Sequence, residues 1–142
     1  MPRASDFRAG RHVVYKLKAH LVFVPKYRRG VITERVFDIL QSAWSKVCTD
    51  FEGELLKSNF EPNHVHLMVS YPPKVALAVL VNSLKGVSAR LVRSADLPEV
   101  RNKLWGKHFW SPSYCAVSCG GASLEVVAKY IQSQNRMGSS PS

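Results

Sequence analysis

The stretch His64-Val-His-Leu-Met-Val-Ser70 alternates between two sets of side chains and predicts a β-strand. One face of this strand receives the apolar residues Val65, Leu67 and Val69, and the other receives His64, His66 and Met68. The apolar face must be buried, so the histidines point to the open side of a sheet. Imidazoles at positions i and i+2 of a strand can share one metal ion, although two exposed or hydrogen-bonded histidines would show the same spacing.

The patterns on both sides of this strand predict a β-α-β-β-α-β order followed by a terminal helix. Before it we expect a long strand ended by Pro25, a helix capped by Thr33 and a short strand; after it we expect a helix, a connector, an edge strand containing Pro112 and a last helix. The corresponding ranges are 13–24, 33–53, 54–60, 74–95, 97–105, 109–118 and 123–136. This order indicates an α+β fold of the ferredoxin-like type, shared with RNA-recognition (RRM-like) domains, in which helices cover one face of an antiparallel sheet.

Composition limits the class of protein and its partners. The chain has 142 residues, 46% of them hydrophobic, so we expect a single domain over 1–142 with a real core and flexible tails at 1–11 and 137–142. The formal net charge of +10 favours nucleic acid as the partner, with an anionic membrane surface as the second choice. The first 30 residues carry eight basic side chains against the single acid Asp6, which predicts a basic face near the start.

The composition and the lengths of the apolar runs also disfavour several classes of protein. The longest apolar runs are far shorter than a membrane span requires, and no secretory signal is visible. The three cysteines lack a C-x-x-C spacing, so a disulfide framework or zinc knuckle is not expected, and a reducing cytoplasm suits them. No nucleotide-cofactor or membrane partner is expected.

The last predicted helix carries a second pair of polar residues. Tyr130 and Gln134 are at i and i+4, so they lie on one side of the helix along the flank of its apolar stripe. On spacing alone, a packed tyrosine with a solvent-exposed hydroxyl and a solvated glutamine are the favoured interpretation. Together with the two histidines, however, an amide oxygen could complete a divalent-metal site, and a phenol one turn away could attack a phosphate held there.

These residues stand in a set of motifs that resembles the single-tyrosine HUH transposases, the small single-strand DNA transposases of prokaryotic insertion sequences. The resemblance covers roughly residues 12–136 and is carried by Val14-Tyr15, His20-Leu-Val-Phe-Val-Pro-Lys-Tyr-Arg-Arg29, Pro62-Asn-His-Val-His-Leu67, Leu84-Lys-Gly-Val-Ser-Ala-Arg90, Leu104-Trp-Gly106, Phe109-Trp110, Ser113-Tyr114, Gly120-Gly121 and Lys129-Tyr-Ile-Gln-Ser-Gln134. The motifs occur in the family's order and with family-like spacing.

The resemblance implies a function and a role for each site residue. It implies that Tyr130 is the nucleophile, that His64, His66 and Gln134 bind one divalent ion, usually Mg²⁺ or Mn²⁺, and that single-stranded DNA is cut and rejoined through a 5′-phosphotyrosine. It further implies a homodimer that binds hairpins near the ends of the element, in the cytoplasm of a prokaryote.

Other residues and other functions stay open at this point. Five basic residues suit DNA phosphates, although each also fits an ordinary solvated surface: Lys26, Arg28, Arg29, Lys85 and Arg90. Four aromatic residues between positions 105 and 114 could stack on bases but are more often core: Trp105, Phe109, Trp110 and Tyr114. The alternative function is a non-catalytic nucleic-acid-binding protein, either an RRM-like module or a domesticated transposase. A carboxylate-metal transposase is disfavoured, because the ten acidic residues form no convincing triad.

Overall fold

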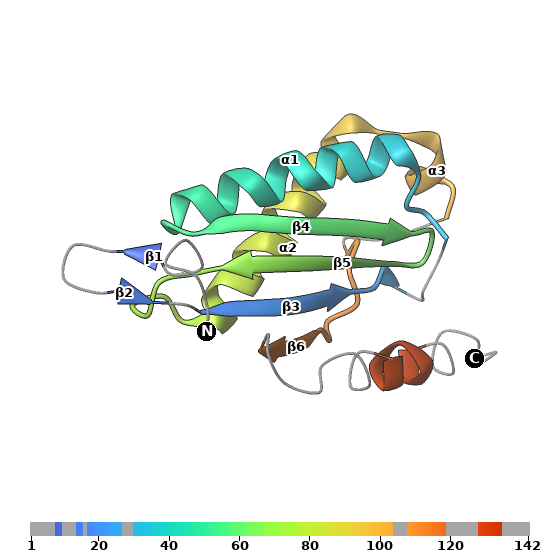
Figure 1. Cartoon of the computed structure of the whole chain (residues 1–142). Helices are drawn as coiled ribbons and strands as arrows, with labels where there is room; N and C mark the ends of the chain where they lie inside the picture. Colours follow the sequence, from blue (N-terminus) through green and yellow to red (C-terminus); the bar gives the residue numbers. More distant parts are fainter. Residues whose placement is uncertain are drawn as a thin grey trace.

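A four-stranded antiparallel sheet, in the order β4-β5-β3-β6, lies at the centre of the protein (Figure 1). The computed structural model describes residues 8–9, 14–15, 17–26, 30–103, 108–118 and 128–134. The strands of the sheet are β3 (Lys18–Phe23), β4 (Glu54–Glu61), β5 (His64–Ser70) and β6 (Cys115–Ser118). With α1 (Glu34–Asp50) after β3 and α2 (Leu77–Ala95) after β5, the order is the predicted ferredoxin-like one.

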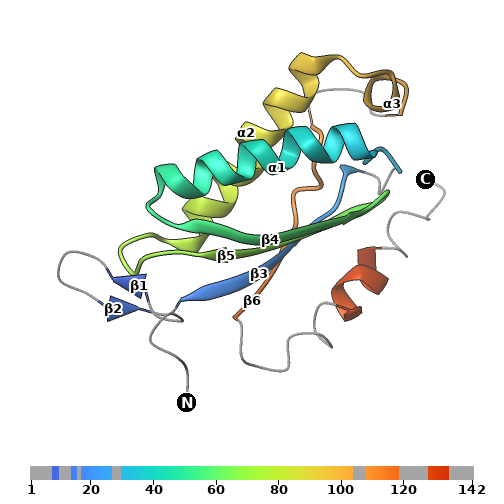
Figure 2. The ribbon, with the colours of Figure 1, turned by 45° about the horizontal axis from the view of Figure 1, so that its top comes forward.

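Both long helices cover the same face of the sheet (Figure 2). In α1 the buried residues recur at helical spacing, and the Thr33 hydroxyl caps the helix by accepting a hydrogen bond from the Val36 N–H at 3.3 Å. Trp44 of α1 packs edge-on against Phe23 of β3, with ring centroids 6.3 Å apart. The core therefore lies between the helices and the sheet. The other face of the sheet, which α1 and α2 do not cover, is called the open face below.

The aromatic residues near β6 belong to this core. Phe109 and Trp110 are only 1% and 5% exposed, and the Trp110 ring packs against Phe23 with centroids 5.6 Å apart. The Trp110 indole donates a hydrogen bond to the buried Ser88 hydroxyl at 3.1 Å. The core interpretation of Phe109 and Trp110 is thus confirmed, Tyr114 is half-buried against the same cluster, and Trp105 lies outside the described residues.

The first predicted strand is divided into two. β2 (Val14–Tyr15) pairs with β1 (Arg8–Ala9) in a separate two-stranded sheet, whereas β3 pairs with β5 and β6. The strand over 13–24 was therefore predicted too long, because the chain changes hydrogen-bonding partners between Tyr15 and Lys18. Arg8–Ala9 lies within the range 1–11 in which a tail is expected, and its backbone pairs with β2; the rest of that range lies outside the described residues.

Two other boundaries, the start of α2 and the start of β6, differ from the expectation by a few residues. α2 begins at Leu77 rather than at 74, because a turn in which the Val75 N–H bonds to the Pro72 carbonyl precedes it. The connector contains the one-turn helix α3 (Pro98–Arg101). β6 covers only the end of the predicted 109–118 strand, and it lies at the sheet edge as Pro112 indicated.

The last helix lies on the side of the sheet opposite to α1 and α2 (Figure 2). Within the predicted range 123–136, the described residues 128–134 are helical, as expected. Val22 and Cys115, on neighbouring strands, form a small buried cluster against which Tyr130 and Ile131 pack. An apolar contact therefore seats this helix over β3 and β6 on the open face.

Candidate active site

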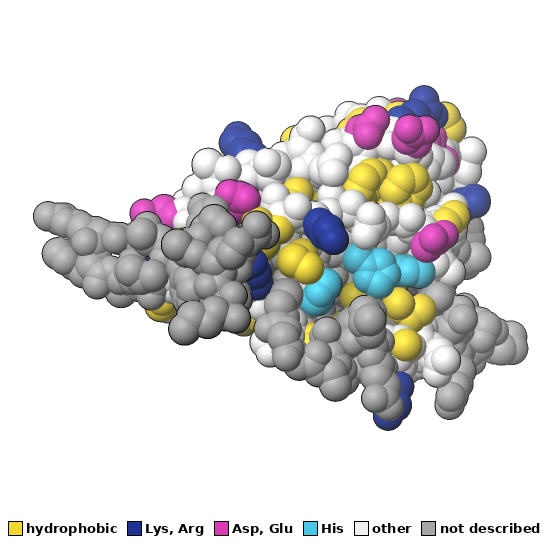
Figure 3. All heavy atoms as spheres, viewed as in Figure 1, with side chains coloured by type: hydrophobic (Ala, Val, Ile, Leu, Met, Phe, Trp, Pro, Cys, Tyr) yellow, Lys and Arg dark blue, Asp and Glu magenta, His cyan; other side chains and the backbone are white. Residues whose placement is uncertain are grey.

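His64 and His66 lie on the open face of β5, as the alternation predicted. Both side chains are half-buried, whereas Val65, Leu67 and Val69 between and beyond them are at most 1% exposed. The two imidazole rings are 5.0 Å apart at their centroids and inclined by 75°. Histidine side chains gather in one region of this face (Figure 3), so the sheet presents a pair of imidazoles to solvent and substrate.

A neighbouring amide orients the first of these rings. The Nδ1 atom of His64 lies 2.8 Å from the Oδ1 atom of Asn63. Because an amide oxygen only accepts hydrogen bonds, Nδ1 must carry the proton, and in the neutral ring the lone pair is then on Nε2. A hydrogen bond to the second nitrogen is how proteins hold metal-binding histidines, so this contact prepares Nε2 as a ligand.

The second ring is held in its neutral form. Burial lowers the pKa of His66 below its ordinary value of 6.5, the charge of His20 lowers it further, and Glu61 opposes both effects. Only a neutral imidazole can bind a metal ion. His20 is a member of this face that sequence reasoning missed; its place two residues before Val22 in β3, with the same parity, was the available signal.

A cavity of about 570 Å³ opens beside the histidine pair at the β4 side of the sheet. In the register, Asn59 faces His66 and Glu61 faces His64, so two more polar side chains of β4 lie next to the imidazoles. The cavity is lined by Phe37, Ser58, Asn59, Phe60, Glu61, His64 and His66. Within the described part of the chain, no three His, Cys, Asp or Glu side chains are grouped as a metal site. A third ligand of another type, such as an amide oxygen, would complement the two imidazoles, and this donor set fits a divalent ion.

Tyr130 lies on the same face, toward the opposite edge of the sheet. Its hydroxyl is 2.9 Å from the Ser113 hydroxyl, two residues before β6. Val22, which packs in the cluster that contacts Tyr130, is the register partner of His66. The candidate nucleophile and the candidate metal ligands therefore share one sheet face, with β3 between them.

The environment of Tyr130 keeps its phenol protonated at neutral pH. Burial raises the phenol pKa above its ordinary value of 10, the hydrogen bond with Ser113 opposes that rise, and Cys115 adds a smaller increase. A protonated phenol is a weak nucleophile, so a reaction at this oxygen needs help in removing the proton.

Gln134 is buried rather than solvated. It is 9% exposed, and it follows Tyr130 by one helical turn on the side that faces the sheet. Of the two possibilities that the spacing left open, the structure shows the inward-facing one. Gln134 is thus a buried amide on the same side of the last helix as Tyr130.

The predicted DNA-contact residues have different surroundings. Lys26 follows β3 and is half-buried, Arg90 is exposed on α2, and Arg28 and Arg29 lie outside the described residues. The Lys85 ammonium donates to the carbonyl oxygens of Ser111 and Ser113 at 2.7 and 3.2 Å. Burial lowers the Lys85 pKa below its ordinary value of 10.5. Lys85 therefore also tethers the segment that carries Ser113 to α2.

Two further expectations concern the whole chain. Cys48 and Cys115 are buried free thiols, consistent with the absence of a predicted disulfide framework, and Cys119 lies outside the described residues. None of the described helices has the length and apolar character that crossing a bilayer would require.

Comparisons with known proteins agree on one family. The family model described as "Transposase IS200 like" matches residues 13–134. The ISDra2 transposase TnpA of Deinococcus radiodurans is 35% identical over 130 residues, which are 92% of this chain and 92% of that protein. The transposase for insertion sequence element IS200 of Salmonella typhimurium is 25% identical over 136 residues, 94% of this chain and 89% of that protein.

Solved structures show the same fold. A crystal structure of a candidate transposase from Deinococcus radiodurans superposes with a TM-score of 0.78 and 33% identity, covering 89% of this chain and 97% of that one. A REP-associated tyrosine transposase bound to a REP hairpin has the same fold at a TM-score of 0.55 and 14% identity, over 85% of this chain and 67% of that one. The resemblance drawn from the motifs is confirmed: this chain belongs to the IS200-like transposase family and is a DNA transposase.

Proposed function

We propose that this transposase cleaves and rejoins single-stranded DNA by nucleophilic attack of the Tyr130 hydroxyl on a phosphodiester. The new bond joins the Tyr130 oxygen to phosphorus, the bond to the 3′ oxygen breaks, and the phenol proton is lost as the leaving oxygen gains one. The products are a 5′-phosphotyrosine and a free 3′-hydroxyl. The covalent link is itself a phosphodiester, so the reverse attack by a 3′-hydroxyl rejoins DNA without ATP.

One observation carries the proposal. Tyr130 packs on the cluster around Val22, and Val22 is the register partner of His66 on the same open face. An inward-facing phenol and a pair of imidazoles thereby lie on one side of a sheet whose other side is filled by core. No such gathering is needed for a protein that only binds nucleic acid.

His64, His66 and Gln134 would hold one divalent ion, Mg²⁺ or Mn²⁺. When bound, the ion would polarise the phosphate and offset the charge on the leaving oxygen. Asn63 keeps His64 in the required tautomer, and the burial of His66 keeps that ring neutral. The chain's own contribution is therefore a prepared set of donors, with Tyr130 seated on the same face.

The substitution Tyr130→Phe tests the nucleophile directly. It removes the attacking oxygen and keeps the ring that packs on Val22 and Cys115, so we expect normal folding and DNA binding but no covalent adduct. The assay incubates labelled single-stranded element ends with the protein and resolves adducts on a denaturing gel. Tyr114→Phe is the matched control, because it removes a neighbouring phenol that is not placed on the open face. A normal adduct from the Tyr130 variant would contradict the proposal.

The substitution His64→Ala tests the metal site. The ring is half-buried and lies outside the core, so we expect folding to be unchanged and the Mg²⁺-dependent adduct to be lost. Lys46→Ala, at an exposed position on α1 and on the other side of the sheet, should form the adduct at the normal rate. Cleavage that continues in EDTA would rule out the metal.

The substrate and the assembly complete the proposal. We expect the DNA to be a single strand with a hairpin at the element end and the active form to be a homodimer, as the motif resemblance implies; light scattering measures the mass. A hairpin is also what the REP-associated structure contains. The remaining alternative is a domesticated transposase that binds such hairpins without cutting, and it would give binding without an adduct in the wild-type protein.

A further inference from the structure

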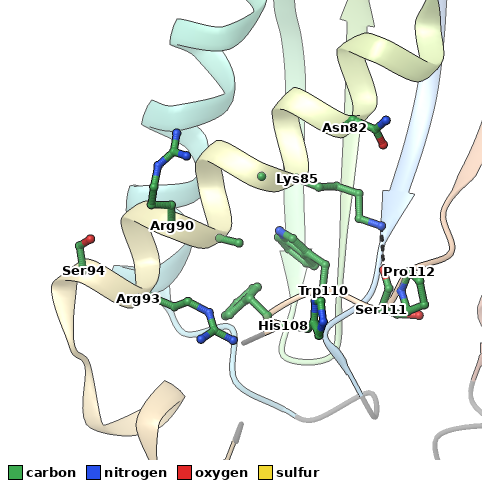
Figure 4. A pocket seen from close by; sticks show the side chains of 12 residues that line it. Asn82, Lys85, Arg90, Arg93, Ser94, His108, Trp110, Ser111 and Pro112 are labelled. Atoms are coloured by element: carbon green, nitrogen blue, oxygen red, sulfur yellow. Dashed lines mark hydrogen bonds between the residues drawn. The ribbon is translucent and has the colours of Figure 1, made fainter. Parts of the chain in front are cut away.

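A second cavity lies away from the histidine pair, on the helix-covered side of the sheet. It has a volume of about 710 Å³ and lies between the second half of α2 and the segment 108–112 that leads to β6. Figure 4 shows its two walls: Arg93 extends from α2 toward His108, and Lys85 extends toward Ser111. The volume is typical of sites that hold a small molecule or one unit of a polymer.

The lining of this cavity is cationic. Lys85, Arg90 and Arg93 all belong to it, and none of the described residues that line it is acidic. The remaining polar side chains of the lining are those of Asn82, Ser94, His108 and Ser111. A cavity with three cations and no anion is complementary to a negatively charged ligand, and a planar guanidinium suits phosphate oxygens.

Gly86 supplies a second, independent observation. It lies in the middle of α2 and lines the cavity, and a Cβ atom added to it would meet nothing within 4 Å. A glycine inside a helix costs about 1 kcal/mol relative to alanine. Within the described structure, nothing of the chain packs on this position to require it. An open strip of helix between long basic side chains leaves room for a flat group to approach the backbone.

The opposite wall is held rigidly. The Lys85 ammonium donates hydrogen bonds to the carbonyl oxygens of Ser111 and Ser113. The Trp110 indole donates one to the Ser88 hydroxyl of α2. Phe109 and Trp110 are buried, so they form the floor, while His108 is exposed at the rim and offers a ring face. The cavity is therefore preformed, as binding sites usually are.

We propose that this cavity binds one nucleotide of single-stranded DNA, with its phosphate against Arg90 and Arg93 and its base over Gly86 beside the His108 ring. The site is separate from the candidate active site, and it rests on the proposed function only in taking single-stranded DNA as the ligand. Because its wall at Ser111 and Pro112 leads directly to Ser113, a strand held here lies beside the segment that contacts Tyr130.

Cavity filling tests the site. In the Tyr130→Phe background, which forms no adduct, the probe is a fluorescein-labelled oligothymidylate of about 12 nucleotides, read by anisotropy. Gly86→Leu fills the open strip of α2, whereas Gly86→Ala adds only a methyl group and leaves most of the space. The leucine variant should therefore bind the oligothymidylate about tenfold more weakly than the alanine variant. Both residues favour helix, and urea midpoints check that both variants fold.

Charge removal tests the phosphate contact. Arg90→Gln should reduce the slope of log affinity against log salt by about 0.7, the value for one phosphate on single-stranded DNA. Lys46→Gln removes one exposed cation from α1, away from the cavity, and should leave the slope unchanged. The salt dependence of Arg90→Gln tests the proposal even if Gly86→Leu fails to fold.

The outcomes separate the two proposals. Equal affinities of Gly86→Leu and Gly86→Ala, or a slope that Lys46→Gln changes as much as Arg90→Gln does, would overturn the cavity as a nucleotide site. Neither result would bear on the adduct formed by Tyr130 in the unsubstituted protein. Conversely, the unsubstituted protein could form no adduct while Gly86→Leu weakens oligothymidylate binding. That result would support the cavity as a nucleotide site and contradict the proposed cleavage.

Discussion

At the scale of single residues, Ser113 is the closest polar partner of the candidate nucleophile. Its hydroxyl meets the Tyr130 hydroxyl at 2.9 Å, and Lys85 holds its carbonyl oxygen from α2. The motif set contained Ser113 only in the pair Ser113-Tyr114, so its contact with Tyr130 had no signal in the spacing. Two residues 17 positions apart are brought together only when β6 and the last helix fold onto one sheet face.

We predict that Ser113→Ala slows adduct formation while hairpin binding is unchanged. The hydrogen bond with Ser113 lowers the Tyr130 pKa against the effect of burial, so its loss makes the phenol harder to deprotonate. A net hydrogen bond is worth about 0.5–1.5 kcal/mol, which corresponds to about a two- to tenfold slower rate. The rate is measured by single-turnover adduct formation across pH.

Ser113→Thr is the matched control, because it keeps the hydroxyl. We expect it to restore the rate at neutral pH, and we expect the alkaline limb of the Ser113→Ala profile to move to higher pH. If alanine and threonine behave alike, the contact has no part in the reaction.

At the scale of elements, two glycines of the helices and turns have opposite surroundings. Gly53 lies between α1 and β4, where an added Cβ atom would come within 2.2 Å of the Ser70 carbonyl oxygen, a backbone atom that cannot move aside. Gly86 in α2 meets nothing within 4 Å. The same residue type therefore marks a close approach of two elements in one case and an open surface in the other.

We predict that alanine destabilises the protein at Gly53 and stabilises it at Gly86. Crowding at Gly53 should lower the free energy of unfolding by about 1–3 kcal/mol. At Gly86 the gain in helix propensity should raise it by about 0.5–1 kcal/mol. Urea unfolding of both variants measures the two changes, and equal signs at the two positions would contradict the packing at Gly53.

At the scale of the whole molecule, Glu99 connects the start of α1 to α3, two parts of the helical layer that are far apart in the sequence. Its carboxylate in α3 accepts hydrogen bonds from Arg35, at 2.7 Å from Nε, and from the Thr33 hydroxyl that caps α1, also at 2.7 Å. These contacts join the start of α1 to the connector after α2. They also hold the pKa of Glu99 at about 2, below its ordinary value of 4.5, with Arg35 the larger cause.

We predict that Glu99→Gln lowers stability at neutral pH and that this loss disappears in acid. A carboxyl group whose pKa is lower in the folded protein stabilises the fold fully above its unfolded pKa, near 4.5, and loses that effect as the pH falls through about 2. Thermal melting of both proteins between pH 7 and pH 2 would show the two curves converging. Glu52→Gln, which removes the exposed ion pair with Lys74, should change the melting temperature less at every pH.

Local patterns were sufficient to predict most of the fold. The alternation over His64–Ser70 set both faces of β5, because a side chain's face in a strand depends only on parity. The apolar spacing of α1 and its Thr33 cap are equally local, and they placed the helix correctly. The motif set named the family, which the comparisons confirm.

The sequence by itself determined the order of the elements, the buried face of β5, and the residue types of a transposase site. Only the tertiary structure decided that β2 leaves the main sheet, that Gln134 is buried, that His20 lowers the pKa of His66, and that Ser113 meets Tyr130. The physical reason is distance along the chain. Parity and helical period act over a few residues, whereas these contacts join strands and a helix that only the closed sheet and its docked C-terminal helix bring within hydrogen-bonding or electrostatic range.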